Sequence, residues 1–187
     1  MTTAPVLDPL LAAARECVMD VGFKRTTLAD VARRAGVSRM TVYRQYGDLP
    51  TIVNALLTCE FVALIEAVRA EVAHLPTARE RLVEAGARLV EELVHHPLYR
   101  RVLDVDPELL LPLVVDRLGS TQRAAIEVVA QQVAEGQRDG SIRPVDPMLA
   151  ATCLQLTAQS FVFSARVVEG QDVLPELRRL LEGYLVP

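Results

Sequence analysis

Residues 27–46 read TLADVARRAGVSRMTVYRQY, and this stretch decides the fold of the amino-terminal part of the chain. Its first half repeats apolar residues at the spacing of one helical face, namely Leu28, Val31, Ala32 and Ala35. Thr27 is expected to cap this helix, with Asp30 as the acid of a capping box. Gly36 tolerates a positive φ and ends the helix in a sharp turn, after which Ser38 caps a second short helix. The pattern predicts a helix-turn-helix.

The outer face of the second helix carries groups that suit a DNA groove: Arg39, Met40, Thr41, Tyr43, Arg44 and Gln45. Arg39 lies early on this helix and is our candidate for reading the acceptor edge of guanine. Thr41, Tyr43 and Arg44 are candidates for phosphate contacts, and the capping residues Thr27 and Ser38 belong to the same predicted surface. Taken alone, the pattern also fits a solvated helical hairpin whose arginines only keep it soluble.

Further motifs surround this stretch over about the first sixty residues: Ala13-Ala14, Gly22-Phe23, Thr26–Ala32, Ala35–Ser38, Thr41–Tyr43, Tyr46-Gly47 and Leu56-Leu57. In this respect the chain resembles the tetracycline-repressor (TetR) family of bacterial transcription regulators. The resemblance implies an all-α fold of about nine helices, in which a three-helix DNA-binding domain precedes a larger helical domain. It also implies dimerisation through the last two helices, and a small molecule that releases the protein from DNA.

Two positions depart from the family's usual pattern. Leu49, followed by Pro50, stands where the family usually has a Lys that contacts a phosphate, although backbone N–H groups at that helix start can still approach one. Tyr46 replaces a more usual Phe, a change that the core should accept.

The charge of the chain is unevenly distributed. The 187 residues carry a net charge of −4. Between Gly22 and Asp48, however, the sequence contains six basic residues and only two acids. This local net charge of +4 leaves a net charge of −8 for the rest of the chain. A basic head on an acidic body orients the head toward DNA. Lys24 and Arg25 are further candidates for contacts to the duplex backbone, or are simply solvated charges at a loop.

Composition indicates a soluble, well-cored protein, with 51% hydrophobic residues. Cys17, Cys59 and Cys153 are dispersed and are read as small buried hydrophobes in a reducing compartment. We see no secretory signal, and no stretch approaches an unbroken membrane span, the closest being residues 149–168. The expected location is the cytoplasm, away from membranes.

Helical patterns continue through the remaining chain, and no convincing strand pattern occurs. A first helix precedes Gly22, and Asp48 is expected to cap a long helix that runs to about His74. The later helices are expected over residues 78–94, 97–105, 107–118, 121–137, 147–168 and 174–185. We assign residues 1–48 to the DNA-binding domain and residues 49–187 to effector binding and dimerisation.

The helix expected over residues 147–168 is nearly uncharged, since between Met148 and Val168 the only formal charge is Arg166. Such a helix must be buried on most sides, most simply against a second copy of the chain. The candidate interface residues are Leu156, Phe163, Val167, Leu177 and Leu181. A two-fold homodimer would place two reading helices about one DNA turn apart on a palindromic operator.

Polar residues on otherwise apolar helices are candidates for binding a small hydrophobic effector: His95, Gln131 or Gln132, Gln155, Gln159 and Ser160. Ligand sites combine an apolar lining with a few polar anchors. The same amides and hydroxyls would also suit a subunit interface or hydrogen bonds to the backbone.

An enzymatic constellation is not visible in the sequence. His74, His95 and His96 lack the spacing of a metal site, so we expect neither a metal nor another cofactor. The acidic cluster of Asp104, Asp106 and Glu108 is read as helix capping around Pro107. The sequence therefore predicts a ligand-responsive, homodimeric transcription regulator, most simply a repressor. The alternative is a helical dimeric DNA-binding or protein-interaction module without an effector.

Overall fold

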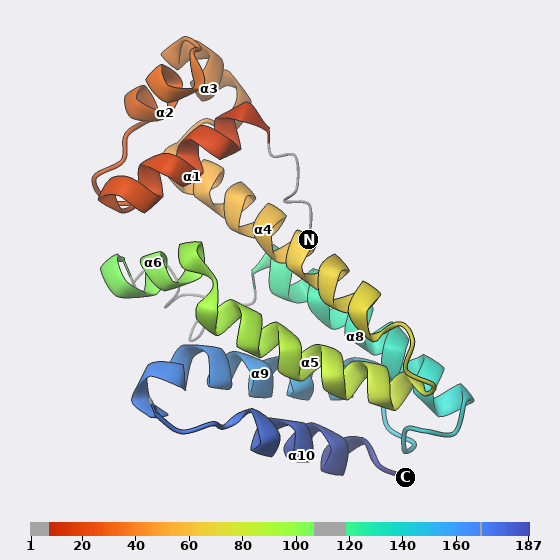
Figure 1. The fold of residues 1–187 in the computed structure, drawn as a ribbon. Coiled ribbons are helices and arrows are strands. Elements are labelled where there is room, and N and C mark those ends of the chain that lie inside the picture. The colour runs from red at the N-terminus through yellow and green to blue at the C-terminus, as the bar shows by residue number, and fades with distance from the viewer. Residues whose placement is uncertain (1–7, 107–118, 169) are drawn as a thin grey trace. The chain divides into compact units, whose positions relative to one another are not determined.

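The computed structural model describes residues 8–106, 119–168 and 170–187. Within these ranges all the regular secondary structure is helical (Figure 1). Nine α-helices and one 3₁₀ helix are described: α1 (Pro9–Val21), α2 (Leu28–Ala35), α3 (Arg39–Tyr46), α4 (Leu49–Val72), α5 (Ala78–His95), α6 (Pro97–Val105), α8 (Ser120–Arg138), α9 (Pro147–Ser164), η2 (Ala165–Val168) and α10 (Leu174–Leu185). The predicted all-α fold is confirmed. The helix expected over 107–118 lies outside the described residues.

Side-chain caps begin the helices where the sequence predicted them. The Asp48 carboxylate accepts a hydrogen bond from the Thr51 backbone N–H at 2.8 Å, at the start of α4. Asp146 accepts one from Leu149 N–H at 2.8 Å, at the start of α9. Each cap satisfies one of the N–H groups that a first helical turn leaves without a partner. The helix expected to run to residue 168 is α-helical only as far as Ser164, after which η2 continues it.

The chain forms two compact units. The first contains the described residues up to Ala63 together with His95 to Asp106; the second contains Leu64–Val94 and the described residues after 118. The division between the two units falls inside α4 and again at the end of α5. The assignment of separate functions to residues 1–48 and 49–187 remains a prediction.

In the first unit, α2 and α3 pack with α1 around a small apolar core (Figure 1). The side chains of Val18, Val31 and Val42 are fully buried, one from each of these helices. Helix α6 also packs against α1, where it contributes the buried Leu98 and Val102. The helix-turn-helix is thus braced by a helix that follows it by about fifty residues.

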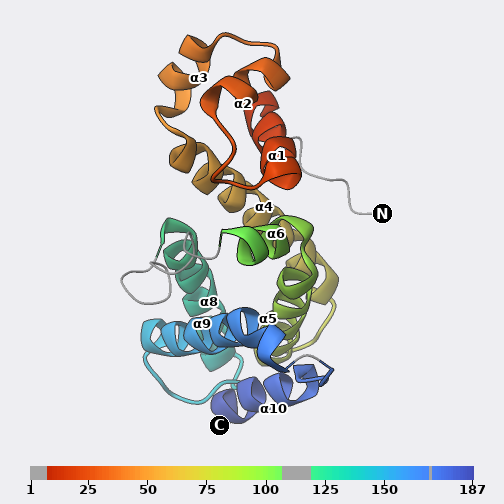
Figure 2. The ribbon, with the colours of Figure 1, turned by 90° about the vertical axis from the view of Figure 1, so that its left-hand side faces the viewer.

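In the second unit, α9 lies against both α8 and α10 (Figure 2). The core of this unit joins α5, α8, α9 and α10 through Val83, Val90, Val133, Ile142, Ala150, Leu154, Leu177, Leu181 and Leu185. The Arg178 guanidinium of α10 donates to the Glu84 carboxylate of α5 at 2.9 Å, which adds a partly buried ion pair to the apolar contact.

Two expectations from composition need correction. Among the described helices, α4 with its 24 residues is the one long and apolar enough to cross a membrane, judged by length and composition alone. The sequence had instead pointed to residues 149–168 as the closest candidate. The core helix of a soluble protein passes the same test, and Ile52, Leu56 and Val68 of α4 are buried within the protein. Cys59 is exposed, although Cys17 is buried as expected.

Candidate functional site

The helix-turn-helix is fixed by the local hydrogen bonds that the sequence predicted. The Thr27 hydroxyl accepts from Asp30 N–H at 3.2 Å, and the Asp30 carboxylate accepts from Thr27 N–H at 3.1 Å, a complete capping box. Gly36 has φ of +68° and ends α2 in the left-handed region. The Ser38 hydroxyl then accepts from Thr41 N–H at 3.1 Å and begins α3. Gly36 and Ser38 thus form the turn between α2 and α3, while Thr27 and Asp30 fix the start of α2.

The capping box also holds a negative charge at the start of α2. The Thr27 hydroxyl donates to the Asp30 carboxylate at 2.6 Å, and this hydrogen bond is the main cause that lowers the pKa of Asp30. The backbone N–H of Thr27 and the Arg33 guanidinium lower the pKa further. An ionised Asp30 complements the positive end of the helix dipole.

The outer face of α3 exposes both apolar and cationic side chains. Met40 is 71% exposed and Tyr43 is 62% exposed, whereas Val42 between them is fully buried. The side chains of Arg39 and Arg44 are exposed on the same helix. One helical face thus packs on the core while the opposite face presents a thioether, a phenol and two guanidinium groups to a partner.

Other predicted contact residues have partners within the protein. The Ser38 and Thr41 hydroxyls are hydrogen-bonded at 2.9 Å, so they form a pair at the start of α3. The Gln45 amide donates to the Asp8 carboxylate at 2.8 Å, which holds Gln45 against the beginning of α1. Lys24 and Arg25 are exposed in the loop that follows α1.

The positive charge of this surface is smaller than the local sequence count suggests. Arg34 pairs with Asp20 at 2.7 Å and lies 3.6 Å from Glu16, both on α1, and Arg33 pairs with Asp30 at 2.8 Å. Arg25, Arg39 and Arg44 have no ion pair among the described residues and are therefore the arginines best able to meet phosphates.

Sequence reasoning missed how the loop before α2 is held. The Asp106 carboxylate, 1% exposed, accepts a hydrogen bond from the backbone N–H of Phe23 at 2.7 Å. The Arg101 guanidinium donates to the Asp20 carbonyl, and the buried Thr26 hydroxyl donates to the Gly22 carbonyl at 2.7 Å. Asp106 thus anchors the loop that follows α1. Its only sequence signal was an aspartate at a helix end, which does not identify the partner.

The second unit encloses a cavity of about 430 Å³ between α4, α5, α8 and α9, all of whose lining residues belong to that unit. Most of the lining is apolar: Ile65, Val68, Val72, Ala73, Leu82, Ala85, Gly86, Leu89, Ala125, Val128 and Val129. The polar lining is Arg69, Arg81, Gln132, Glu135 and Gln155. A volume of this size, with few polar groups, suits a small organic molecule.

The predicted effector residues divide around this cavity. Gln155 lines it, and so does Gln132, which was the alternative to Gln131. The side chain of Gln131 is exposed and does not line it, and Gln159 is hydrogen-bonded to Gln122.

Two further predicted effector residues do not line this cavity. Ser160 is exposed, because it follows Leu156 by one turn on the outer face of α9. His95 is exposed and belongs to the other compact unit.

The predicted interface residues also divide. Leu156 is 50% exposed and Val167 is 85% exposed, while Phe163 is half-buried. Leu177 and Leu181 are 0% and 4% exposed and pack in the core of their own unit, so they do not offer a free surface to a partner.

The exposed apolar residue of α10 is instead Leu180, which is 56% exposed. Met148 and Leu149 add exposed apolar surface at the start of α9. Sequence periodicity alone did not show which face of α10 packs on its own unit.

A metal centre has no basis in the described residues, among which no group of three His, Cys, Asp or Glu side chains could hold an ion.

Comparison with known proteins identifies the family. The model of bacterial regulatory proteins of the tetR family matches residues 10–55. A helix-turn-helix transcriptional regulator of Mycobacterium bovis is 37% identical over 180 residues, covering 94% of this chain and 92% of the relative. A regulator of Mycobacterium tuberculosis is 36% identical over the same shares of both chains.

Solved structures share the fold at low identity. FadR of Bacillus subtilis, in complex with stearoyl-CoA, superposes with a TM-score of 0.69 at 18% identity, over 95% of this chain and 98% of FadR. The repressor QsdR of R. erythropolis gives a TM-score of 0.70 at 15% identity, over 94% and 92% of the two chains. The chain belongs to the TetR family and is a helix-turn-helix transcriptional regulator, not an enzyme.

Proposed function

We propose that this regulator is a homodimeric repressor that binds a palindromic operator and is released from it by a small molecule. The observation that carries the effector part of the proposal is the apolar cavity of about 430 Å³ in the second unit. Neither Gln132 nor Gln155, which both line it, has a hydrogen-bond partner among the described residues. Both amides are partly buried, and a ligand that enters the cavity would supply them with a hydrogen-bond partner.

The DNA part of the proposal rests on α3. A recognition helix places its first residues against base edges and its flanks against phosphates. Arg39 is exposed at the first position of α3 and is assigned to a guanine, and the exposed Met40 to an apolar base edge such as a thymine methyl. Tyr43, Arg44, Thr41 and the loop cations are assigned to phosphates.

The dimer part of the proposal rests on the exposed apolar residues of the last two helices. Leu149, Leu156 and Leu180 are each at least half exposed. An isologous interface built from α9 and α10 would bury these side chains in both subunits. The resulting pair of α3 helices would meet two half-sites about 34–36 Å apart.

Structural neighbours support a small-molecule effector without identifying it. FadR is described in complex with stearoyl-CoA, a Saccharomonospora viridis regulator with choline, and SmeT with triclosan. AlkX and QsdR are described as repressors. These ligands share no head group, so the chemistry of the effector must come from the cavity of this chain. Binding to the chromosome also assigns the protein to the bacterial cytoplasm.

Selection of DNA from a random pool by the purified full-length protein tests the proposal. We expect two copies of one half-site in inverted orientation, with centres about one or two helical turns apart. A single unrepeated site would overturn the dimeric arrangement. Failure to enrich any sequence would overturn operator binding.

The selected operator then separates an effector-controlled repressor from a constitutive DNA-binding module. Compounds that stabilise the protein against heat are added to the operator complex. Release by at least one of them supports the repressor. A protein whose operator affinity does not change with any stabilising compound would be the constitutive module.

A further inference from the structure

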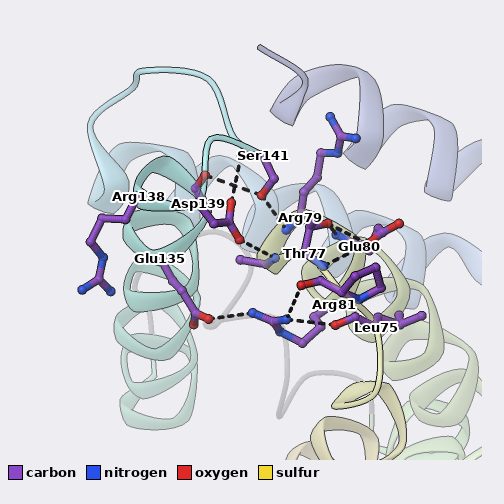
Figure 3. Close-up of polar contacts among 12 residues, drawn as sticks. Leu75, Thr77, Arg79, Glu80, Arg81, Glu135, Arg138, Asp139 and Ser141 are labelled. Atoms are coloured by element: carbon purple, nitrogen blue, oxygen red, sulfur yellow. Dashed lines mark hydrogen bonds and ion pairs between the residues drawn. The ribbon is translucent and has the colours of Figure 1, made fainter.

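The cavity of the second unit carries an ion pair at one end. Its polar end contains Arg81 of α5 and Glu135 of α8, whose guanidinium and carboxylate groups are 2.6 Å apart. Figure 3 shows this ion pair beside Leu75, in the turn between α4 and α5. Leu89 lies eight residues further along α5 and Ala125 ten residues earlier on α8, so both are about 12–15 Å from the ion pair along their helices.

Arg81 is held in place by more than its carboxylate partner. Its guanidinium also donates to the backbone carbonyl of Leu75 at 2.9 Å and of Pro76 at 3.3 Å (Figure 3). The side chain of Arg81 is 21% exposed, whereas that of Glu135 is 43% exposed. Glu135 can therefore turn toward water at low cost, while Arg81 remains fixed at the turn.

The fixed partner decides which ligand charge the polar end prefers. An anionic ligand can replace the Glu135 carboxylate beside Arg81, because the displaced carboxylate is then solvated by water. A cation would instead have to take Glu135 from Arg81 and leave the more buried guanidinium without a carboxylate, which is costly. Arg69 adds a second positive charge to the lining, and Gln132, one turn from Glu135, offers an amide donor.

We propose that the cavity binds an amphipathic carboxylate, whose head group replaces Glu135 as the partner of Arg81 and whose apolar chain extends toward Leu89 and Ala125. Glu135 then acts as an internal competitor that occupies Arg81 in the free protein. This inference rests on the proposed effector function and specifies the chemical class of the effector.

Three probes with the same chain and different head groups test this selectivity: decanoate, decanol and decylammonium. Each is titrated calorimetrically into the full-length protein below the concentration at which the probe forms micelles. We expect decanoate to bind about tenfold more tightly than decanol, as a charge-assisted hydrogen bond predicts, and decylammonium most weakly. Decanol or decylammonium binding as tightly as decanoate, or no binding by any of the three, would overturn the proposal.

Two variants test the assigned residues. Glu135→Gln removes the competing charge and should tighten decanoate severalfold while leaving decanol unchanged. Arg81→Met should make decanoate and decanol bind equally. Arg138→Gln is the matched control, because Arg138 is exposed on α8 and does not line the cavity. If Arg81→Met fails to fold by circular dichroism, the Glu135→Gln result and the wild-type selectivity still decide the question.

Operator binding measured in the same samples separates this inference from the proposed function. Decanoate that binds with the expected selectivity but leaves operator affinity unchanged would support the carboxylate site and contradict effector-controlled release. Decanol that binds equally well and releases the operator would contradict the carboxylate site and support release.

Discussion

The carboxylate of Asp106 accepts a hydrogen bond from the backbone N–H of Phe23 at 2.7 Å, although the two residues lie 83 positions apart. Phe23 follows the last turn of α1, and Asp106 follows the last turn of α6. The second oxygen of Asp106 is buried and has no partner among the described residues. This one side chain therefore links the loop that precedes the helix-turn-helix to the end of α6.

Replacing Asp106 with Ala should destabilise the protein by about 1–3 kcal/mol, because it leaves the Phe23 N–H without its acceptor. Urea unfolding followed by circular dichroism measures the change. Glu92→Ala is the control, since Glu92 is an exposed carboxylate on α5 and should change the free energy of unfolding by less than about 0.5 kcal/mol. Equal effects of the two substitutions would contradict a structural role for Asp106.

Gly22→Ala should cost more stability than Gly36→Ala. Both glycines have positive φ, +85° and +68°, so either substitution strains the backbone by roughly 1–2 kcal/mol. A Cβ at Gly22 would also lie 2.8 Å from Cγ1 of Val105, whereas a Cβ at Gly36 meets no atom within 4 Å. We expect a further loss of at least about 1 kcal/mol at Gly22 by urea unfolding. A larger loss at Gly36 would contradict the close packing of α1 on α6.

What the sequence predicted well depends on residues close together in the chain. The Thr27–Asp30 capping box, the Gly36 turn and the cap at Asp48 each involve partners within four positions, so spacing alone identifies them. Helix bounds followed from the same local signals. The contact of Asp106 with Phe23 could not be predicted, because no local pattern states which distant N–H a buried carboxylate will meet.

The candidate sites show the same limit. Periodicity shows that a helix has two faces but not which of them meets its own core, and so Leu177 was assigned to an interface although it is fully buried. Gln155 and Gln159 looked equivalent on one helix, yet Gln155 lines the cavity and Gln159 is bonded to Gln122. The local excess of positive charge in the sequence included Arg34, but in the fold the Arg34 guanidinium pairs with the Asp20 carboxylate.

Arg39→Ala should relax the preference for one base pair in each half-site and weaken operator binding by about 1–3 kcal/mol. Competition assays with operator variants at fixed salt measure both effects. Arg33→Ala is the control, because Arg33 is exposed but already paired with Asp30. A loss of affinity that is equal for every DNA sequence, with a log–log salt slope smaller by about one, would make Arg39 a phosphate contact instead.

Leu156→Asp and Leu180→Asp should each produce a folded monomer. Both side chains are at least half exposed in the protomer, so a charge there is solvated in the monomer and buried only in the proposed dimer. Sedimentation gives the mass and circular dichroism the helical content. Leu177→Asp, at a fully buried position on the same helix as Leu180, should instead unfold the second unit. Variants at Leu156 and Leu180 that stay dimeric would place the interface elsewhere.

Glu84→Gln should remove a contribution to stability that depends on pH. The hydrogen bond from Arg178 is the main cause that lowers the pKa of Glu84 below its ordinary value of 4.5, and Arg88 adds to it. Because the folded state favours the ionised carboxylate, its contribution is fully present above pH 4.5 and is lost as the pH falls through the lowered pKa. At pH 7 we expect the variant to be roughly 1–3 kcal/mol less stable than the wild type, and this difference to shrink steadily below pH 4.5. Glu127→Gln, on an exposed face of α8, should show almost no difference at either pH. A Glu84→Gln difference that is constant from neutral to acid pH would show that the charge of Glu84 does not stabilise the contact between α5 and α10.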